Sequence, residues 1–347
     1  MVKKDKIRGI DLIRFLSTPK TLQEISAEFG RPESEMEAYL EKRGKLRSYN
    51  LFVHRNDSQK LIYVYDKEKR NELIIKPRVW TYRKHEELPY LWISFPNNLN
   101  FKKIILAPIS DAHYGSLAHI SKKFDDYLNW IARSNNVFGF LVGDEVENCH
   151  ADSPPGAIFE QMMRPKDQII SFRKKLAPLA HKILFGVPGN HEGRGTKKTD
   201  IDPLYFGICE PLGIPYFDEP VFVDILWKTY VFTMYCRHGS GNAQTKGGKI
   251  NKALQALDFQ EHIMFNIMGH VHDPMLDDTP RICRERNFDE DGNLESFRLV
   301  HKKQYTIICP SFLSYFGSYG ARMGFSPPNT NITTCEIYPN GKYHATS

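Results

Sequence analysis

The chain has 347 residues, of which 41% are hydrophobic and 25% are charged, and its formal net charge at pH 7 is +6. That length suffices for one large domain or for two domains, and the composition is that of a globular chain rather than a disordered one. We expect no membrane helix and no secretion signal, because no apolar run approaches the roughly 18 residues of a membrane span. Six scattered cysteines, without a Cys-x-x-Cys pair, favour a cytoplasmic location over a disulfide framework.

The excess positive charge lies in the N-terminal part of the chain. Residues 1–100 hold 20 basic and 14 acidic residues, whereas basic and acidic residues balance in the remainder. A basic segment is compatible with a polyanionic partner such as nucleic acid. The alternative interpretation is a basic face that is simply well solvated.

The first 66 residues are predicted to form a small domain of three helices and a hairpin. An amphipathic pattern over residues 7–17 favours a first helix. Thr21–Glu24 is a capping box that opens a second helix ending at Gly30, and Pro32 lies at the start of a third. Two β-rich runs then predict a hairpin, Tyr49–His54 and Leu61–Tyr65. This order of elements resembles a winged helix-turn-helix domain.

The charges of this domain allow two interpretations. A winged helix commonly reads DNA with its third helix. Here that helix begins with acidic residues that phosphates would repel, Glu33, Glu35 and Glu37. Basic residues that could contact a nucleic-acid backbone follow them, Lys42, Arg43, Lys45, Arg47, Arg55 and Lys60. The domain therefore either binds nucleic acid or docks a protein partner or a second copy.

Residues 67–100 are predicted to be a connector that partly packs on the next domain, with Tyr90–Phe95 as one strand. Over residues 101–347, short apolar runs alternate with helical patterns, which indicates an α/β domain with buried strands. The acidic residues after the last of these alternations are assigned to a solvated loop, Asp278, Asp289, Glu290 and Asp291.

Five apolar strand-like runs each end in residues that can bind a metal ion. These residues are Asp111, His113, Asp144, Asn190, His191, His238, His270 and His272. Side chains just past the carboxyl ends of strands can converge in one crevice even when they are far apart in sequence. The set lacks thiolates and therefore suits two divalent metals such as Mn, Fe or Zn. An aspartate can bridge two ions, and a two-metal site holds both the attacking and the leaving oxygen of a phosphoryl transfer.

Five motifs occur in order along this part of the chain: Asp-x-His, Gly-Asp-x-x-Glu, Gly-Asn-His-Glu, a lone His before Gly, and Gly-His-x-His. Together they resemble the calcineurin-like metallophosphoesterase family over roughly residues 101–347. The resemblance implies a β-sandwich flanked by helices. It also implies two metal ions and a bridging hydroxide as the nucleophile. Mn is the preferred metal, with Fe or Zn as alternatives. The implied ligands are Asp111, His113 and His272 for one ion, Asn190, His238 and His270 for the other, and Asp144 as the bridge.

Two further residues are candidates for catalysis. His191 is not needed as a ligand in this scheme, so it can donate a proton to the departing oxygen. Glu147 stands where the family more often has Asp, and we expect it to orient and charge-stabilise His191. Arg194 could clamp a phosphate oxygen, or it could be an ordinary loop cation.

The expected substrate follows from motif details and from the N-terminal domain. Asp-Ala-His-Tyr-Gly resembles the opening motif of the DNA-repair exonuclease branch of the family. Gly-Asn-His-Glu-Gly-Arg resembles the protein-phosphatase branch, but Ser110 and Pro188 replace the Gly and Arg of that branch. We therefore expect a phosphodiesterase that acts on nucleic acid, with DNA as the preferred substrate. We also expect a phage or mobile-element origin and a location in the host cytoplasm. The alternative is a phosphomonoesterase or nucleotide phosphodiesterase whose N-terminal module docks a protein.

Overall fold

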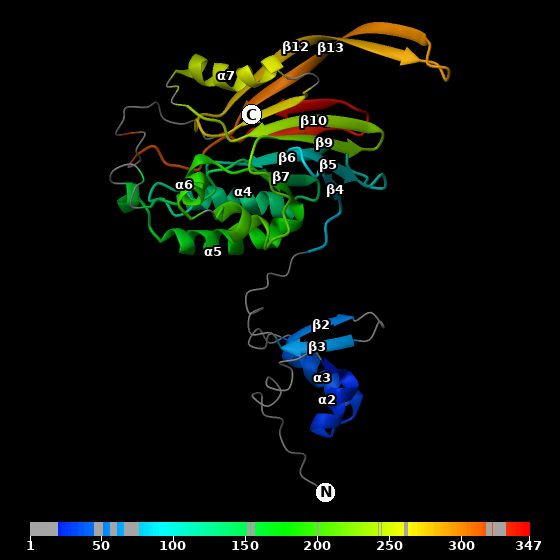
Figure 1. The fold of residues 1–347 in the computed structure, drawn as a ribbon, viewed down its shortest axis with the longest axis vertical. Coiled ribbons are helices and arrows are strands. Elements are labelled where there is room, and N and C mark those ends of the chain that lie inside the picture. Colours follow the sequence, from blue (N-terminus) through cyan, green and yellow to red (C-terminus); the bar gives the residue numbers. More distant parts are fainter. Residues whose placement is uncertain are drawn as a thin grey trace. The chain divides into compact units, whose positions relative to one another are not determined.

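The computed structural model describes residues 20–44, 51–55, 61–65, 76–150, 153, 157–199, 201–241, 243, 245–259, 263–316, 321 and 331–347. The chain divides into two compact units, residues 1–73 and residues 74–347, whose elements are labelled in Figure 1. Both contain helices and sheet, so the chain is of the mixed α/β class. Within the described ranges, no helix has the length and the apolar character that crossing a membrane requires.

The described residues of the first unit form two helices and a small antiparallel sheet of order β1-β3-β2. α2 (Leu22–Phe29) begins at a capping box, in which the Glu24 carboxylate accepts from the backbone N–H of Thr21 at 2.6 Å. It ends at Gly30, which has the left-handed φ of 59° that glycine adopts without strain. α3 (Glu33–Gly44) buries Met36 and Leu40. The strands are β1 (Lys20–Thr21), β2 (Leu51–Arg55) and β3 (Leu61–Tyr65).

Some predictions for this unit fall outside the described part of the chain. The helix expected over residues 7–17 is one of them. The side chains of the basic residues expected to contact nucleic acid are others, Lys42, Arg43, Lys45, Arg47, Arg55 and Lys60. Their contribution therefore stays a prediction.

The second unit is built on two mixed sheets. The seven-stranded sheet has the order β12-β13-β11-β10-β9-β5-β4, and the five-stranded sheet has the order β15-β14-β6-β7-β8. The first sheet consists of β4 (Thr81–Lys84), β5 (Tyr90–Phe95), β9 (Val221–Trp227), β10 (Tyr230–Arg237), β11 (Phe265–Met268), β12 (Met275–Phe288) and β13 (Leu294–Ile308). The second consists of β6 (Ile104–Ile109), β7 (Val137–Leu141), β8 (Ile183–Gly186), β14 (Thr334–Ile337) and β15 (Tyr343–Thr346).

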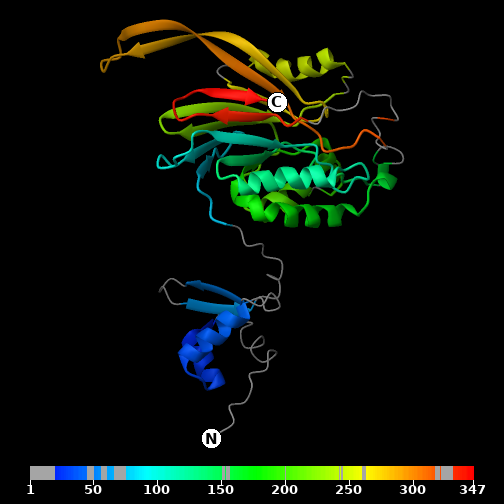
Figure 2. The same cartoon turned by 180° about the vertical axis from the view of Figure 1, so that it is seen from behind.

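One hydrophobic core lies between the two sheets, which are stacked in Figure 2. It includes Phe138 and Phe140 from the five-stranded sheet and Phe232 and Phe265 from the seven-stranded sheet. Three strands of the five-stranded sheet, β6, β7 and β8, are almost continuously apolar, because helices cover the other face.

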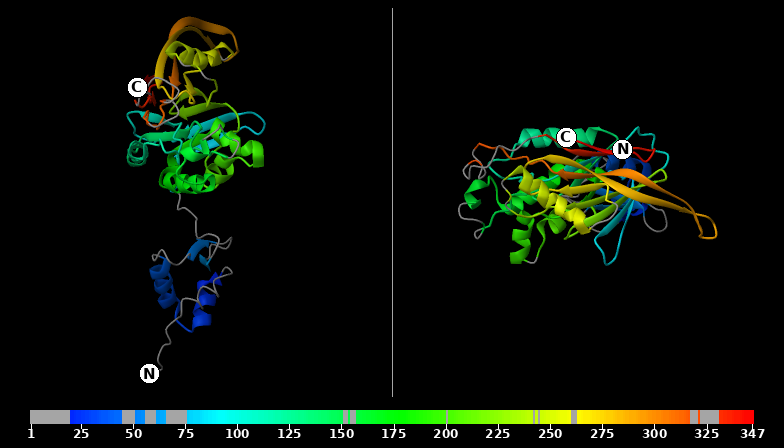
Figure 3. Two further views of the ribbon diagram at one scale, coloured as in Figure 1. Left: turned by 90° about the vertical axis from the view of Figure 1, so that its left-hand side faces the viewer. Right: turned by 90° about the horizontal axis from the view of Figure 1, so that it is seen from above.

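Helices cover the outer faces of both sheets (Figure 3). α4 (Ser121–Arg133) and α5 (Pro165–Leu176) lie over the five-stranded sheet, and α7 (Lys246–Leu254) packs on β11 and β13. α6 (Asn190–Thr199) follows β8 directly. Shorter helical turns are η2 (Ala157–Glu160), η3 (Ala177–Lys182), η4 (Tyr205–Cys209) and η5 (Gln255–Phe259).

Residues 76–100 belong to the second unit and not to a connector. β5 pairs in parallel with β9, and β4 pairs with β5. Trp80, Leu91 and Ile93 are buried in the shared core. The predicted connector over residues 67–100 and the boundary at 101 therefore differ from the structure, in which the second unit begins at Ile74.

A long hairpin, β12–β13, stands where the sequence predicts a solvated acidic loop. Asp278 lies within β12, and Asp289, Glu290 and Asp291 form the turn. The dense charge on the projecting parts of both strands hides their period-two pattern, which is why the sequence did not indicate those parts.

Lys182 is a buried cation at the end of a helix. Its Nζ donates to the carbonyls of Ile131, at 2.6 Å, and Ser134, both at the C-terminus of α4. A lysine there satisfies carbonyls that the helix leaves without partners. Burial nevertheless lowers the pKa of Lys182 to about 8.

Candidate metal centre

The seven expected ligands lie in five segments that follow the carboxyl ends of strands, six of them in loops and Asn190 at the start of α6. β6 leads to Asp111 and His113, β7 leads to Asp144, and β8 leads to Asn190. β10 leads to His238, and β11 leads to His270 and His272. Because these strands are neighbours in two packed sheets, their loops meet at one end of the core.

The backbone at this end of the core is strained at the expected ligand residues. Five of the expected ligands have left-handed φ angles, which are uncommon for residues other than glycine: Asp111 (47°), His113 (44°), Asp144 (54°), His270 (71°) and His272 (55°). Such a conformation costs roughly 1–3 kcal/mol per residue, and it persists only where the surrounding structure enforces it. Strain concentrated on these residues is typical of a functional site.

One group of donors consists of Asp111, His113, Asp144 and His272. Each offers a ligand atom within 4.8 Å of the others. Nε2 of His113 is 3.2 Å from Nε2 of His272, which in turn is 3.0 Å from a carboxylate oxygen of Asp111. Both aspartates and His113 are buried, so the group is shielded from bulk water.

A second group shares Asp144 with the first and adds His238 and His270. Oδ2 of Asp144 is 3.2 Å from Nε2 of His238. Oδ1 of Asn190 is 2.9 Å from Nδ1 of His270 and 3.3 Å from Nε2 of His238. The amide oxygen is therefore a further donor to this group, and the structure brings all seven expected ligands together around Asp144.

The orientation of the imidazoles fits metal ions. Nδ1 of His238 donates to the carbonyl of Val142 at 2.8 Å, so the lone pair of the neutral ring lies on Nε2 and faces Asp144. Nδ1 of His113 contacts the Glu147 carboxylate at 3.0 Å, which likewise directs Nε2 toward the group. Outer contacts of this kind commonly fix metal-binding histidines. Buried His and Asp groups in this arrangement could hold a metal ion.

Charge balance supports the same conclusion. Burial alone would raise the pKa of Asp144, but the imidazoles of His238 and His191 hold it well below its usual value. Burial opposes charge on the rings, yet Glu147 raises the pKa of His113 to about 9 and Asp144 raises that of His238 to about 10. Protons on the rings compensate the buried carboxylates, and a divalent cation could replace those protons.

Glu147 and His191 are close to each other, but not paired as the sequence predicts. The nearest ring partner of the Glu147 carboxylate is His113, whereas Nδ1 of His191 is 3.7 Å from that carboxylate. Nδ1 of His191 instead donates to the backbone carbonyl of Glu147 at 2.6 Å. The backbone carbonyl of Glu147 thus takes the place of the predicted side-chain pairing with His191, while its carboxylate contacts His113.

The His191 ring is therefore held with its Nε2 toward the centre, 3.9 Å from Oδ2 of Asp144. Burial lowers the pKa of His191 to about 4, so the ring is neutral at neutral pH and Nε2 carries a lone pair. Nη1 of Arg194 stands 3.1 Å from Nδ1 of the same ring. Since that nitrogen already donates to Glu147, the guanidinium adds positive charge there and no hydrogen bond.

Glu192 is a residue whose role the sequence did not indicate. It is fully buried, and its two carboxylate oxygens accept from the backbone N–H groups of Asp144, Glu145, Val146 and Gly189. It thus joins the loop after β7 to the loop after β8. Its position in Gly-Asn-His-Glu was visible in the sequence, but its partners are backbone atoms that no sequence pattern identifies.

Close backbone packing accounts for the glycines of the motifs. A Cβ atom at Gly189 would lie 2.1 Å from a carboxylate oxygen of Asp144, and one at Gly143 would lie 2.4 Å from the backbone nitrogen of Gly189. A Cβ atom at Gly269 would collide with the Ser110 hydroxyl. Glycine is required at these positions because the loops touch.

An apolar rim continues from the loop that carries His113. Leu117 is four residues beyond His113, and its N–H donates to the carbonyl of Glu160. On its other side, the N–H of Ser314 donates to the carbonyl of Ala118. These contacts hold segments whose apolar side chains are strongly exposed, Leu117 (61%), Phe159 (83%), Met162 (54%) and Phe316 (86%).

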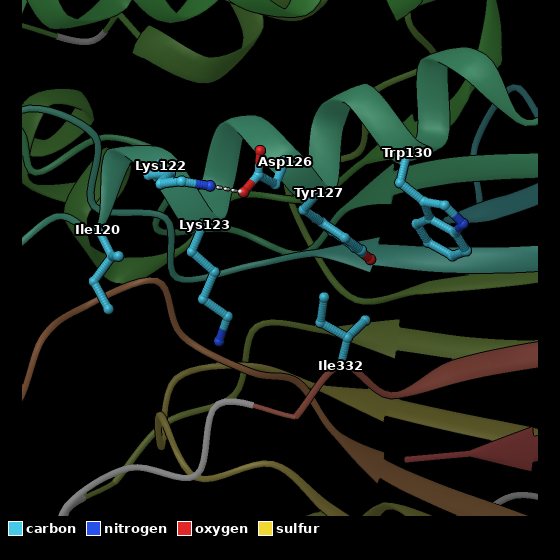
Figure 4. Close-up of a pocket in the computed structure, with 7 residues that line it drawn as sticks. All are labelled: Ile120, Lys122, Lys123, Asp126, Tyr127, Trp130 and Ile332. Atoms are coloured by element: carbon cyan, nitrogen blue, oxygen red, sulfur yellow. Dashed lines mark hydrogen bonds and ion pairs between the residues drawn. The ribbon is translucent and has the colours of Figure 1, made fainter.

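A hollow of about 480 Å³ lies elsewhere, along α4, and Figure 4 shows its lining. Tyr127, Trp130 and Ile332 make it largely apolar, and Lys122 pairs with Asp126 at its edge, at 2.7 Å. None of the candidate ligands lines it. The metal centre and this hollow are separate features.

Comparison of the chain with protein-family models and with curated proteins finds no match.

Proposed function

We propose that this chain is a two-metal phosphodiesterase of the calcineurin-like metallophosphoesterase class. Its substrate is nucleic acid, with DNA preferred. The observation that carries the proposal is the position of Asp144 between two groups of nitrogen and oxygen donors. One carboxylate shared by two such groups is the arrangement that a pair of divalent ions requires. The donors are imidazoles, carboxylates and an amide without thiolates, which suits Mn, Fe or Zn, and of these we propose Mn.

Each residue of the centre has a definite part in this scheme. Asp111, His113 and His272 would hold one ion, Asn190, His238 and His270 would hold the other, and Asp144 would bridge them. When bound, the ions would supply Lewis-acid polarisation of the phosphoryl group and would acidify water. Glu147 orients His113, the Val142 carbonyl orients His238, and Glu192 holds the loop of Asp144.

His191 is the candidate for moving a proton. Its Nε2 faces the centre, while Nδ1 is fixed by the Glu147 carbonyl. In the free protein this ring is neutral, so it must gain a proton before it can give one to a leaving oxygen. The negative charge of a bound phosphoester would favour that protonation, since a nearby anion raises the pKa of an imidazole. We propose that His191, with Nε2 facing the centre, is the group that gives this proton.

Two observations favour nucleic acid as the substrate. The loop of His113 and the segments hydrogen-bonded to it expose Leu117, Phe159 and Phe316, which suits a substrate with flat apolar groups next to its phosphates. The N-terminal 100 residues carry the excess positive charge of the chain, which favours a polyanion. For the first unit we propose a winged-helix role in holding that polyanion.

The direct test is hydrolysis by the Mn-supplemented protein of single- and double-stranded DNA, RNA, and p-nitrophenyl mono- and diesters, side by side. We expect cleavage of DNA and of the diester, and loss of both in Asp144→Asn. Phe159→Ser combined with Phe316→Ser should reduce cleavage of single-stranded DNA more than that of the small diester. Activity on the monoester alone would contradict the proposal.

A second candidate is a phosphomonoesterase or nucleotide phosphodiesterase whose first unit docks a protein. The acidic start of α3, with Glu33, Glu35 and Glu37, favours it, because these charges would repel DNA. Under this alternative, mononucleotides would be better substrates than DNA of any length.

A further inference from the structure

The β12–β13 hairpin extends well beyond the sheet from which it grows. β13 pairs with β11 only over Tyr305–Ile308, whereas β12 and β13 continue to pair with each other out to Phe288 and Leu294. Figures 1 and 3 show this part as a two-stranded ribbon that projects from the second unit. We call residues 281–302 the ribbon. A two-stranded hairpin without a third strand or a covering helix is marginally stable in water.

The two faces of the ribbon differ in character. In an antiparallel pair, residues opposite each other share a face, so the register places Ile282, Arg284 and Arg286 on one face with Leu299 and Phe297. The other face holds Glu285 with Arg298 and Lys302, at 2.6 and 3.0 Å. Glu285 therefore pairs with two of the cations on the second face, whereas no ion pair joins the described residues of the first face.

The first face exposes an unusual amount of apolar surface. Exposed fractions are 67% for Ile282, 75% for Phe297 and 65% for Leu299, and Phe288 and Leu294 near the tip are exposed by 58% and 53%. A contiguous exposed apolar surface of this kind commonly marks an interaction site. We call it the apolar face.

The charges along the apolar face are arranged in two blocks. Arg284 and Arg286 lie in the middle of the ribbon, and within the described residues neither has an acidic partner. Asp289, Glu290 and Asp291 lie at the tip. A nucleic acid laid along this surface would meet the acidic tip, which disfavours it. A second copy laid antiparallel would place its acidic tip against the arginines and its own arginines against the tip.

We propose that the apolar face is where two copies of this chain associate, ribbon against ribbon, around a two-fold axis. Such a contact is self-complementary in both charge and apolar surface, as a two-fold interface must be. The ribbon has eight residue pairs and is therefore about 27 Å long. The buried area would then lie at the low end for protein interfaces, so we expect a dimer with a Kd in the micromolar range.

Sedimentation velocity of the full chain at concentrations from about 1 to 200 µM tests the proposal, and we expect a reversible shift from monomer to dimer. Phe297→Ser combined with Leu299→Ser should leave a monomer throughout. Val300→Ser removes apolar surface from the opposite face and should leave the dimer unchanged. Equal melting temperatures of the three proteins would show that the ribbon variants still fold.

Charge exchange gives a second and independent test. Arg284→Glu with Arg286→Glu should weaken the dimer at least tenfold, and so should Glu290→Lys with Asp291→Lys. All four substitutions in one chain restore opposite charges across the two-fold axis and should recover the dimer. A wild type that stays monomeric at 200 µM overturns the proposal. A quadruple variant that dimerises as weakly as the two double variants also overturns it. A wild-type dimer that the Phe297 and Leu299 substitutions leave intact does the same.

Discussion

The carboxylate of Glu192 accepts a hydrogen bond from the backbone N–H of Asp144 at 2.9 Å, across 48 positions of sequence. Three more N–H groups donate to the same carboxylate, those of Glu145, Val146 and Gly189. In Glu192→Gln, the amide NH₂ would face two of these donors whichever way it turned. We expect a loss of roughly 2–4 kcal/mol in the free energy of unfolding, measured by urea denaturation. The exposed Glu210→Gln is the matched control and should change stability by less than about 0.5 kcal/mol.

Asp144→Asn should weaken the binding of both metal ions, because one carboxylate serves both groups of donors. Elemental analysis after dialysis should find about two ions per wild-type chain and far fewer in the variant. His270→Ala, which touches only the second group, should leave one ion. A wild type that retains a single tightly held ion would contradict the two-metal proposal.

His191→Asn should leave the metal content near that of the wild type, since the ligand groups around Asp144 remain complete. Turnover should fall by roughly 10²–10⁴, the usual contribution of a positioned proton donor. The loss should be smaller for a p-nitrophenyl ester, whose leaving group scarcely needs a proton. If the substitution removes a metal ion, His191 is a ligand and the proposed role is incorrect.

Deleting residues 1–73 should leave hydrolysis of a small diester nearly unchanged, because every candidate ligand lies beyond residue 110. Cleavage of long DNA should fall through weaker binding. The salt dependence of that binding should flatten, by just under one unit of log–log slope for each lost phosphate contact. An unaltered salt slope would favour a protein partner for the first unit.

Lys182 should make stability depend on alkaline pH. Its pKa is about 8 in the folded chain and about 10.5 when unfolded. Between these values the unfolded state binds the proton and the folded state does not, so stability rises with pH there and is insensitive to this group below pH 8. Compared with Lys182→Met, the wild type should gain about 1–2 kcal/mol between pH 8 and 9.5, as measured by urea denaturation. Parallel pH profiles for the two proteins would contradict this account.

The positions of the ligands could be predicted from the sequence because a single rule governs them. Apolar runs such as Ile104–Ile109 and Phe265–Met268 form buried strands, and polar residues after them meet at one end of the sheets. The partners of Glu147 and Glu192 could not be predicted in the same way. Their contacts depend on side-chain reach and on backbone atoms of distant loops, which leave no pattern in the chain.

Strand recognition failed for a different reason. β5 alternates clearly between buried and half-buried residues, whereas the projecting parts of β12 and β13 carry charged and apolar residues that are mostly exposed. Alternation of apolar and polar residues with a period of two indicates that one side of a strand is buried. A ribbon that buries neither face within its own chain therefore does not produce that signal.

The left-handed residues of the centre have a consequence for ion selectivity. Contacts between the loops, such as those of Glu192, support these conformations, so the donors would form a template of defined size. An ion that fits it binds without ordering the loops, and little entropy is lost at that step. An ion of another radius cannot be accommodated by relaxing the loops without breaking contacts such as those of Glu192. Discrimination between metals would then reside in the backbone as much as in the identity of the side chains.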